Sequence, residues 1–162
     1  THHLYGAPLI TSLIKQVMGD RSFVLGATDA GRAKWVQSLA RDLDVQPAFV
    51  YKKRDAVTGT IALTGINADV RGHEVVVYDD MIRTGSSLLQ AGRAYLAAGA
   101  SKVHAVATHL VLPGDSLERL LAADVFASIS GSDSHPSSKK LADKGFIVAQ
   151  VAERLVPALA RS

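Results

Sequence analysis

The sequence predicts an α/β fold: a three-layer protein with a mostly parallel, twisted sheet of about five strands and helices on both faces. Short apolar runs alternate along the whole chain with segments of helical periodicity. The apolar run at residues 74–79, EVVVYD, is β-branched and unbroken. Parallel strands that are covered on both faces read as continuous apolar runs, and strands that alternate with helices favour a parallel sheet.

The individual elements follow from the local pattern along the chain. Strands are expected at 22–28, 47–52, 74–79, 102–112, 125–130 and 146–151. Helices are expected at 4–18, 31–43, 86–99, 115–123 and 152–160. Residues 53–65 are too polar and irregular to be core, and residues 131–140, GSDSHPSSKK, are expected to form a surface loop. No repeat or linker divides the chain, so residues 1–162 are predicted to form one domain.

Composition narrows the possible partners. The chain of 162 residues is 48% hydrophobic, enough for a real core, and it has no cysteine, which excludes disulfides and favours a reducing, cytoplasmic location. No apolar run approaches the ~18 residues of a membrane span, so no membrane partner is expected. The net charge is only +3 and 6% of residues are aromatic. This balance argues against nucleic acid and favours small anions such as phosphates.

The segment VVVYDDMIRTGSS, residues 75–87, is the strongest candidate for a functional site. Ligands of open parallel sheets bind beyond the carboxyl ends of the strands, where Asp79 and Asp80 are expected. The following turn leads into a helix, whose N-terminus can hold an anion, and Gly85 allows close approach of the backbone. Carboxylates accept hydrogen bonds from sugar hydroxyls and bind hydrated Mg²⁺. Acids beside an anion cradle therefore predict a sugar-phosphate site.

Four stretches resemble the type I phosphoribosyltransferase fold and, within it, the ribose-phosphate pyrophosphokinases. VVVYDDMIRTGSS resembles the phosphoribosyl-pyrophosphate-binding motif of that fold. Residues 28–40, TDAGRAKWVQSLA, resemble the segment of the synthetases that begins Asp-x-Gly-Gly. Residues 49–55, FVYKKRD, resemble their Lys-Arg-Arg segment, and residues 99–120 resemble their Ala-Thr-His-Gly segment. The order and spacing match the C-terminal half of such an enzyme, so the chain is expected to be that domain of a longer synthetase.

The resemblance implies transfer of a pyrophosphoryl group from Mg·ATP to ribose 5-phosphate. Asp79 and Asp80 would bind the ribose hydroxyls, and Asp29 and Asp79 would contact the metal, Mg²⁺. The sugar phosphate would be held by Arg83, Thr84, Gly85, Ser86 and Ser87. The catalytic cations would be Lys52, Lys53 and Arg54, with the choice between the two lysines open. The resemblance also implies phosphate or nucleotide effectors, a homo-oligomer, and little turnover by the isolated chain.

Five positions depart from the family pattern: Arg32, Trp35, Arg83, Ser86 and Leu110. Arg32 stands at the second glycine of Asp-x-Gly-Gly, and Arg83 stands where synthetases commonly place a third acid. Arg83 would either strengthen phosphate binding or displace the metal. Ser86 costs nothing if its φ is negative and strains the loop if its φ is positive. Ligand binding survives such changes more easily than catalysis does.

Other interpretations stay open at this point. The chain could be a phosphoribosyltransferase acting on a nucleobase, although no hood segment for the base is recognisable, or a non-catalytic subunit that binds ribose phosphate. The motif alone is also compatible with an acid-rich strand end before an ordinary helix cap, and the cations at 52–54 with a solvated charge run. His109 is expected to be a core histidine, and Trp35 to pack at a helix face or a subunit interface.

Overall fold

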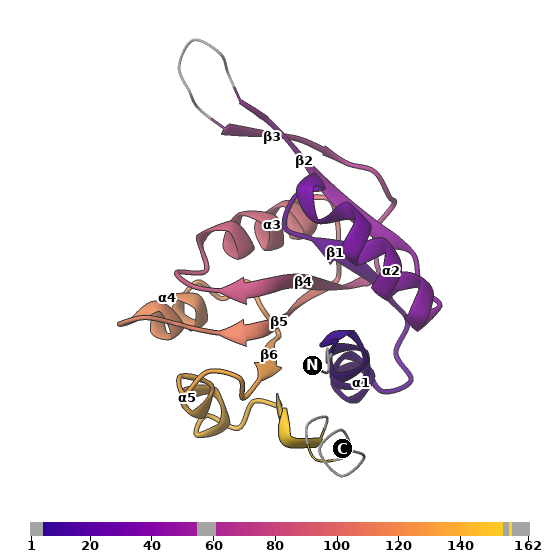
Figure 1. Ribbon diagram of the computed structural model, residues 1–162. Coiled ribbons are helices and arrows are strands. Elements are labelled where there is room, and N and C mark those ends of the chain that lie inside the picture. Colours follow the sequence, from indigo (N-terminus) through magenta and orange to yellow (C-terminus); the bar gives the residue numbers. More distant parts are fainter. Residues whose placement is uncertain (1–4, 55–60, 154–155, 157–162) are drawn as a thin grey trace.

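A seven-stranded sheet lies between two layers of helices in the computed structural model, which describes residues 5–54, 61–153 and 156 (Figure 1). The strands are β1 (Phe23–Ala27), β2 (Pro47–Arg54), β3 (Ile61–Ile66), β4 (Glu74–Ile82), β5 (Lys102–Leu110), β6 (Ser128–Ser132) and β7 (Val148–Ala149). The helices are α1 (Ala7–Met18), α2 (Ala33–Leu43), α3 (Ser86–Ala97), α4 (Ser116–Ala122) and α5 (Ser138–Ala142), with a 3₁₀ turn η1 (Ala30–Arg32) before α2. The strand order is β3-β2-β1-β4-β5-β6-β7, and only β2 and β3 pair antiparallel. The predicted mostly parallel α/β fold is confirmed, with seven strands in place of about five.

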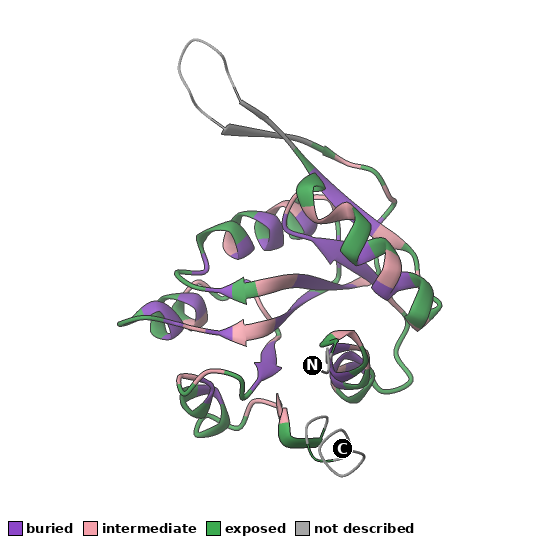
Figure 2. Ribbon diagram, viewed as in Figure 1, coloured by how far each residue is buried: buried purple, intermediate pink, exposed green. Residues whose placement is uncertain are grey.

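Strand β4 is the centre of the molecule and is buried on both faces (Figure 2). Val75 and Val77 belong to the core cluster that includes side chains of α3, α4 and α5. Val76 and Tyr78 belong to the cluster that includes side chains of α1 and α2. Because successive side chains of a strand point to opposite faces, β4 contributes to both cores, as its continuous apolar run predicts.

Helix α3 is anchored to the sheet through a buried tyrosine. Tyr95 is fully buried, and its hydroxyl lies 3.0 Å from the carbonyl oxygens of both Ala27 and Ala48. The ring fits because Gly26 has no side chain: a Cβ there would come within 2.8 Å of it. This contact fixes the helix that begins directly after the candidate loop.

Three parts of the chain differ from the expected elements. Residues 61–66 form β3, which pairs with β2 in an arm that projects from the sheet (Figure 1), whereas no strand was expected there. The surface loop expected at 131–140 is wrong in part, because β6 runs to Ser132 and α5 begins at Ser138. Of the helix expected at 152–160, residues 152, 153 and 156 are helical and the others lie outside the described residues. Within the described ranges, no helix combines the length and apolarity needed to cross a membrane.

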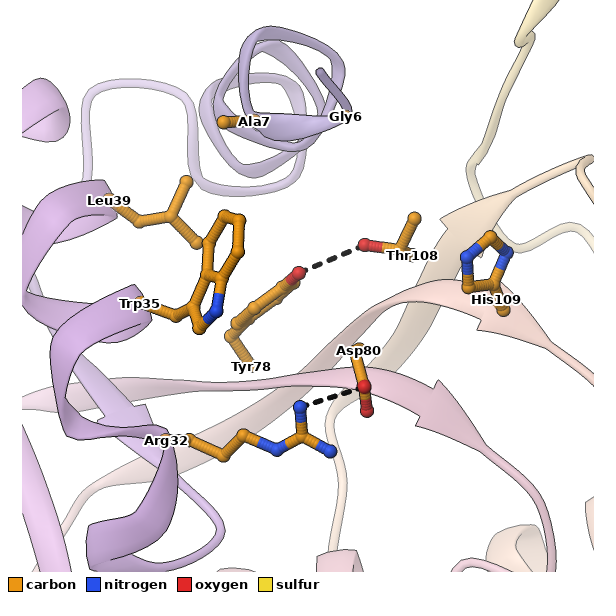
Figure 3. Close-up of a pocket in the computed structure, with 9 residues that line it drawn as sticks. All are labelled: Gly6, Ala7, Arg32, Trp35, Leu39, Tyr78, Asp80, Thr108 and His109. Atoms are coloured by element: carbon orange, nitrogen blue, oxygen red, sulfur yellow. Dashed lines mark hydrogen bonds and ion pairs between the residues drawn. The ribbon is translucent and has the colours of Figure 1, made fainter. Parts of the chain in front are cut away.

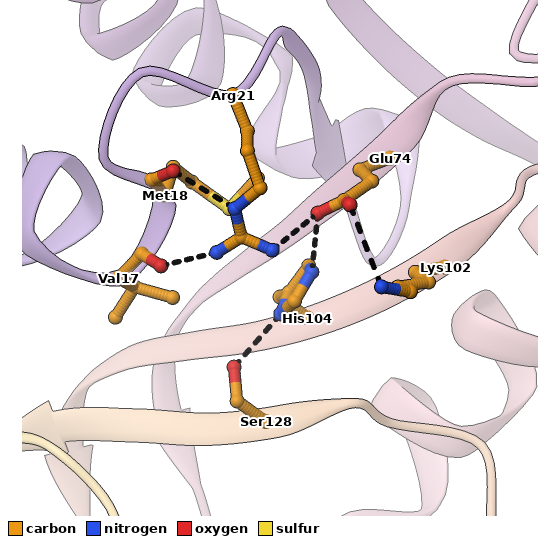
Figure 4. Close-up of polar contacts among 7 residues, drawn as sticks. All are labelled: Val17, Met18, Arg21, Glu74, Lys102, His104 and Ser128. Carbon is orange, nitrogen blue, oxygen red and sulfur yellow. Dashed lines mark hydrogen bonds and ion pairs between the residues drawn. The ribbon is translucent and has the colours of Figure 1, made fainter.

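A polar cluster holds the end of α1 against the opposite, amino-terminal end of the central strands (Figure 4). Glu74, at the start of β4, accepts a hydrogen bond from Arg21 at 2.8 Å and lies 2.9 Å from His104. The other ring nitrogen of His104 lies 2.8 Å from Ser128 on β6. Burial lowers the pKa of His104, which favours the neutral ring. One carboxylate thus joins α1, β4 and β5 far from the candidate site.

Glu74→Gln tests this cluster. The substitution leaves Arg21 and His104 facing a neutral amide in a half-buried position, so the free energy of unfolding is expected to fall by about 1–2 kcal/mol. Urea unfolding followed by circular dichroism measures the change, with the exposed Glu118→Gln on α4 as the matched control. Equal effects of the two substitutions would show that the cluster does not stabilise the fold.

Candidate functional site

Two acids lie at the carboxyl end of β4, inside the last part of the strand. Asp79 pairs with Ala107 across the sheet, and the side chain of Asp79 is 14% exposed whereas that of Asp80 is 48% exposed. One carboxylate oxygen of Asp79 accepts the backbone N–H of Asp80 at 2.9 Å. The hydroxyl of Thr28, at the end of neighbouring β1, lies 3.4 Å from the other oxygen. One shielded and one solvent-exposed carboxylate therefore lie together at the carboxyl end of the central strand.

Arg32 binds both acids and was not expected to be a site residue. Its guanidinium donates to Asp80 at 2.7 Å and lies 3.7 Å from Asp79. It comes from η1, which follows β1, and parallel pairing of β1 with β4 brings it 48 residues across the chain to the acids. Asp29 begins η1 by accepting the N–H of Gly31 at 2.9 Å, as expected of an N-terminal cap. The sequence signals for Arg32 were its place directly after a strand end and its departure from the second glycine of the Asp-x-Gly-Gly segment.

The surroundings of the two carboxylates shift their pKa values in opposite directions. Burial, together with a hydrogen bond shared with Asp80, raises the pKa of Asp79 to about 6. For Asp80, burial acts in the raising direction, but the hydrogen bonds with Asp79 and Arg32 outweigh it and lower the pKa. Near neutral pH the exposed acid is fully ionised and paired with arginine, while the shielded acid titrates close to the physiological range.

The loop after β4 forms the second half of the site. Gly85 has a φ of 78°, and a Cβ there would come within 2.5 Å of Leu120, so only glycine fits. No side chain caps α3, and its first backbone bond runs from Leu89 to Gly85. The N–H groups of the first turn are therefore directed out of the helix, as in helix N-termini that can bind anions.

These residues enclose one cavity of about 340 Å³, here called the loop cavity. It is lined by Arg32 and residues 79–88. All seven residues expected to bind the sugar phosphate lie in this range: Asp79, Asp80, Arg83, Thr84, Gly85, Ser86 and Ser87. The structure thus brings together two acids, two arginines, two serine hydroxyls and a helix N-terminus, a set that can bind hydroxyls and an anion at the same time.

The structure also locates the departures from the family pattern. Ser86 is the first residue of α3 and does not have a positive φ, so it causes no backbone strain. Arg83 is exposed at the loop cavity and forms no hydrogen bond or ion pair with the part of the chain that the structure describes. Leu110 is fully buried in the core. Only Arg32 and Arg83 therefore change the charge of the site.

The expected catalytic cations belong to strand β2. Lys52, Lys53 and Arg54 form the end of β2, paired with Leu63, Ala62 and Ile61 of β3, and their side chains lie outside the described part. The expected strand, 47–52, is therefore too short, because pairing with β3 extends it. Asp29 does not line the loop cavity, although its charge acts on Arg32.

A second cavity, of about 240 Å³, adjoins the acids on the face covered by α1 and α2 (Figure 3). We call it the tryptophan cavity: Ala7, Trp35, Leu39 and Tyr78 form apolar walls, Thr108 and His109 add polar groups, and it shares Arg32 and Asp80 with the loop cavity. The expectation that His109 is a core residue is wrong, because the pairing of β5 with β6 shifts between Ala107 and His109. Leu110 therefore lies in the core, while the ring of His109 is partly exposed and 2.7 Å from Ser134.

The carboxylate oxygens of Asp79 and Asp80 are donors of the type that binds Mg²⁺. Within the described ranges, no three histidine or acidic side chains are grouped closely enough to enclose a metal ion. Mg²⁺, however, is commonly held by one or two carboxylates together with substrate phosphates. Asp79 and Asp80 fit that type of site if Arg32 gives up at least one of its ion pairs with them.

Comparison with known proteins defines the class of this protein. Residues 5–134 match the phosphoribosyl transferase domain, and the chain belongs to that family. Hypoxanthine-guanine phosphoribosyltransferase from Bacillus anthracis shares the fold, with a TM-score of 0.52 and 16% identity over 68% of this chain and 73% of its own.

Within the family, the chain is similar to ribose-phosphate pyrophosphokinases. It is 30% identical to that of Hyphomonas neptunium over 99% of this chain and 52% of the relative, and 35% identical to that of Saccharolobus solfataricus over 68% and 38%. The phosphoribosylpyrophosphate synthetase of Mycobacterium smegmatis superposes with a TM-score of 0.78 at 27% identity, covering 96% of this chain and 49% of its own. The chain thus spans about half the length of the relatives it matches.

Asp79→Asn tests the electrostatics of the acid pair. The pKa of Asp79 is about 6 in the folded chain and about 3.9 in an unfolded one. The stability contributed by the protonated form is therefore present below about pH 4 and lost as the pH rises through about 6. Asparagine cannot ionise, so the variant is expected to gain about 1–3 kcal/mol relative to the parent between pH 4 and pH 8.

Urea unfolding at a series of pH values measures this difference. The exposed Asp20→Asn is the control and is expected to follow the parent at every pH. Parallel profiles for Asp79→Asn and the parent would show that Asp79 ionises like an ordinary surface acid.

Proposed function

We propose that this chain is the ribose 5-phosphate-binding, carboxyl-terminal domain of a ribose-phosphate pyrophosphokinase. The observation that carries the proposal is the loop cavity, in which two acids and the uncapped N-terminus of α3 face one space. Carboxylates accept hydrogen bonds from vicinal hydroxyls, and helix N-terminal N–H groups bind phosphate. A sugar phosphate has both groups at opposite ends of one small molecule.

In the proposed complex, the two halves of the cavity bind different parts of the ligand. Asp80 and Asp79 accept from the ribose hydroxyls, while residues 84–87 donate backbone N–H and hydroxyl groups to the 5-phosphate. Arg83, which lines the same cavity, adds positive charge beside the phosphate. Held in this way, the anomeric hydroxyl faces away from the loop toward a nucleotide donor.

The proposed reaction transfers the pyrophosphoryl group of ATP to that hydroxyl, in the cytoplasm. The anomeric oxygen bonds to the β-phosphorus, the bond from this phosphorus to the oxygen of AMP breaks, and the hydroxyl proton is released. Mg²⁺ would be held by Asp79 and Asp80 together with the phosphates and would neutralise charge. Lys52, Lys53 and Arg54, at the end of the β2–β3 arm, would supply further cations, because positioned cations account for much of phosphoryl-transfer catalysis. We also propose nucleotide or phosphate effectors and a homo-oligomer, by analogy with the relatives.

A non-catalytic role in binding ribose phosphate is the second candidate. It is favoured by one observation, the ion pairs of Arg32 with Asp80 and Asp79. A guanidinium at the acids competes with a metal for the same oxygens, which weakens metal-assisted transfer but leaves phosphate binding intact.

Isothermal titration with ribose 5-phosphate tests the proposed ligand. Asp80→Asn removes a charged acceptor of the ribose hydroxyls, so the affinity is expected to fall by about tenfold or more. The control is Asp124→Asn, an exposed position with a φ of 50° that asparagine tolerates. No measurable binding by the parent, or equal affinities of the parent and Asp80→Asn, would refute the assignment of this site.

Turnover separates the two candidate roles. The chain corresponds to about half of the synthetases it matches, so the 162-residue chain alone is expected to bind ribose 5-phosphate but to form little or no phosphoribosyl pyrophosphate from Mg·ATP. Phosphorus NMR of the reaction mixture measures the product. Rapid turnover by this chain alone would contradict a half-enzyme and identify a complete transferase.

A further inference from the structure

A further cavity, of about 370 Å³, lies beside the polar cluster at the amino-terminal end of β5. We call it the serine cavity after Ser128 and Ser130, which line it from one face of β6. Its other walls come from the end of α1 and the turn after it, from β5, and from the segment that leads into β7. It shares no lining residue with the loop cavity or the tryptophan cavity, so the proposed function makes no use of it. Its volume lies in the range of about 300–1,000 Å³ typical of small-molecule pockets.

Ser130 contributes a buried hydroxyl that has no partner. The residue is 1% exposed, and its Oγ is the one buried side-chain nitrogen or oxygen that lacks a hydrogen bond in the described part of the chain. Ser128 differs, because its hydroxyl lies 2.8 Å from Nδ1 of His104. Buried polar groups in folded proteins are almost always hydrogen-bonded, and an exception calls for a physical explanation. Because Ser130 lines the serine cavity, a molecule bound there can supply the missing partner.

The serine cavity carries a net positive charge. Arg21 and Lys102 line it, and no acidic side chain among the described residues does so. Glu74 contacts both cations, at 2.8 Å from Arg21 and 3.8 Å from Lys102 (Figure 4). His104 adds no free polar group, because its two ring nitrogens lie within hydrogen-bond distance of Glu74 and Ser128. Two cations and one acid leave one positive charge, which a single monovalent anion neutralises.

Arg21 is held in place before any ligand binds. Its guanidinium donates to the backbone carbonyls of Met18 and Val17 and to the carboxylate of Glu74. An arginine side chain has five N–H donors, so these contacts leave donors for an anion. A cation that is already ordered loses little conformational entropy when an anion binds to it.

The remaining walls of the serine cavity are largely apolar. Val17, Ala127, Phe146 and Ile147 line it, and Phe146 and Ile147 are half-buried against the two core clusters. An inorganic anion gains nothing from such walls, whereas an organic anion removes apolar surface from water by packing on them. The combination of two cations, an unpartnered hydroxyl and apolar walls therefore fits an anion that has an apolar body.

We propose that the serine cavity binds a small organic monocarboxylate. The carboxylate lies between Arg21 and Lys102, and one of its oxygens accepts the hydrogen bond of the Ser130 hydroxyl. The apolar body of the ligand packs on Phe146 and Ile147. A carboxylate carries the single negative charge that balances this cavity, and it has oxygens enough for both cations and the hydroxyl. This site is independent of the ribose 5-phosphate site and does not rest on the proposed function.

Benzoate is the probe, and the backbone amide shifts of the 162-residue chain in NMR spectra are the readout. Saturable shifts are expected at Ser128, Ser130 and residues 145–147, which line the cavity. Benzamide has the same shape without the charge, and inorganic phosphate has charge without an apolar body, so both are expected to bind about tenfold more weakly or worse. Absence of saturable shifts with benzoate, or shifts confined to other parts of the chain, would overturn the inference. Phosphate binding at these residues as tightly as benzoate would overturn the choice of an organic acid.

Ser130→Ala separates ligand binding from a structural role. The substitution removes a buried hydroxyl that has no partner, so the midpoint of urea unfolding of the free chain is expected to stay equal or rise. The affinity for benzoate is expected to fall by about two- to tenfold, because one hydrogen bond to the carboxylate is lost. A lower midpoint in Ser130→Ala would overturn the inference, because the hydroxyl would then have a partner within the fold.

Lys102→Gln tests the charge of the cavity. The side chain of Lys102 is 58% exposed, so the substitution is expected to leave the fold intact and to weaken benzoate binding by about three- to tenfold. The matched control is Lys34→Gln, an exposed position on α2 that does not line the cavity and is expected to bind benzoate as the parent does. Unchanged benzoate affinity in both Lys102→Gln and Ser130→Ala would overturn the inference and leave the proposed function intact.

Discussion

Burial of β4 on both faces is the constraint on which the rest of the site depends. Val75, Val76 and Val77 have no exposed surface, and they alternate between the two core clusters. The same alternation continues into the acids, so Asp80 follows Tyr78 on the α1–α2 side and Asp79 follows Val77 on the other. This explains why Asp80, but not Asp79, lines the tryptophan cavity. A one-residue shift of the strand would exchange the two acids and move each valine to the opposite core.

The ion pairs of Arg32 with the acids then set the charge of the site. Two adjacent carboxylates at a strand end repel each other, and burial raises the pKa of Asp79 while Arg32 helps to keep that of Asp80 low. The exposed carboxylate therefore stays charged and can accept hydrogen bonds from hydroxyls at any physiological pH. The shielded carboxylate can take up or release a proton near pH 6. Burial of one acid and the hydrogen bonds of the other thus give two identical side chains different chemistry.

Local sequence patterns predicted the core and the main motif, but they could not predict contacts between residues that are distant in sequence. The apolar patterns located β1, β4, β5 and the helices because buried faces require apolar residues at regular spacing. The acids and their loop could be recognised because they are contiguous in sequence. Strand β3 was missed because it pairs with β2 through backbone groups in a projecting arm, which demands no apolar pattern. Arg32 was missed as a site residue because only the pairing of β1 with β4 brings it to the acids. His109 was misplaced because the register of β5 against β6 shifts at this point, and Leu110 takes the core position.

The departures from the synthetase pattern change the balance between metal and phosphate at this edge of the sheet. Arg32 stands where the relatives resembled by this sequence usually have glycine, and Arg83 where they commonly have an acid, so the site gains two positive charges and lacks one negative charge. Each change favours anionic ligands and disfavours a divalent cation held by protein oxygens alone. Ser86 is helical and has no positive φ, so its departure from glycine does not strain the loop before α3. In the proposed complex, a metal would therefore depend on the ligand's own phosphates: a phosphorylated ligand would attract Arg32, and the acids would then be available to the metal that accompanies it.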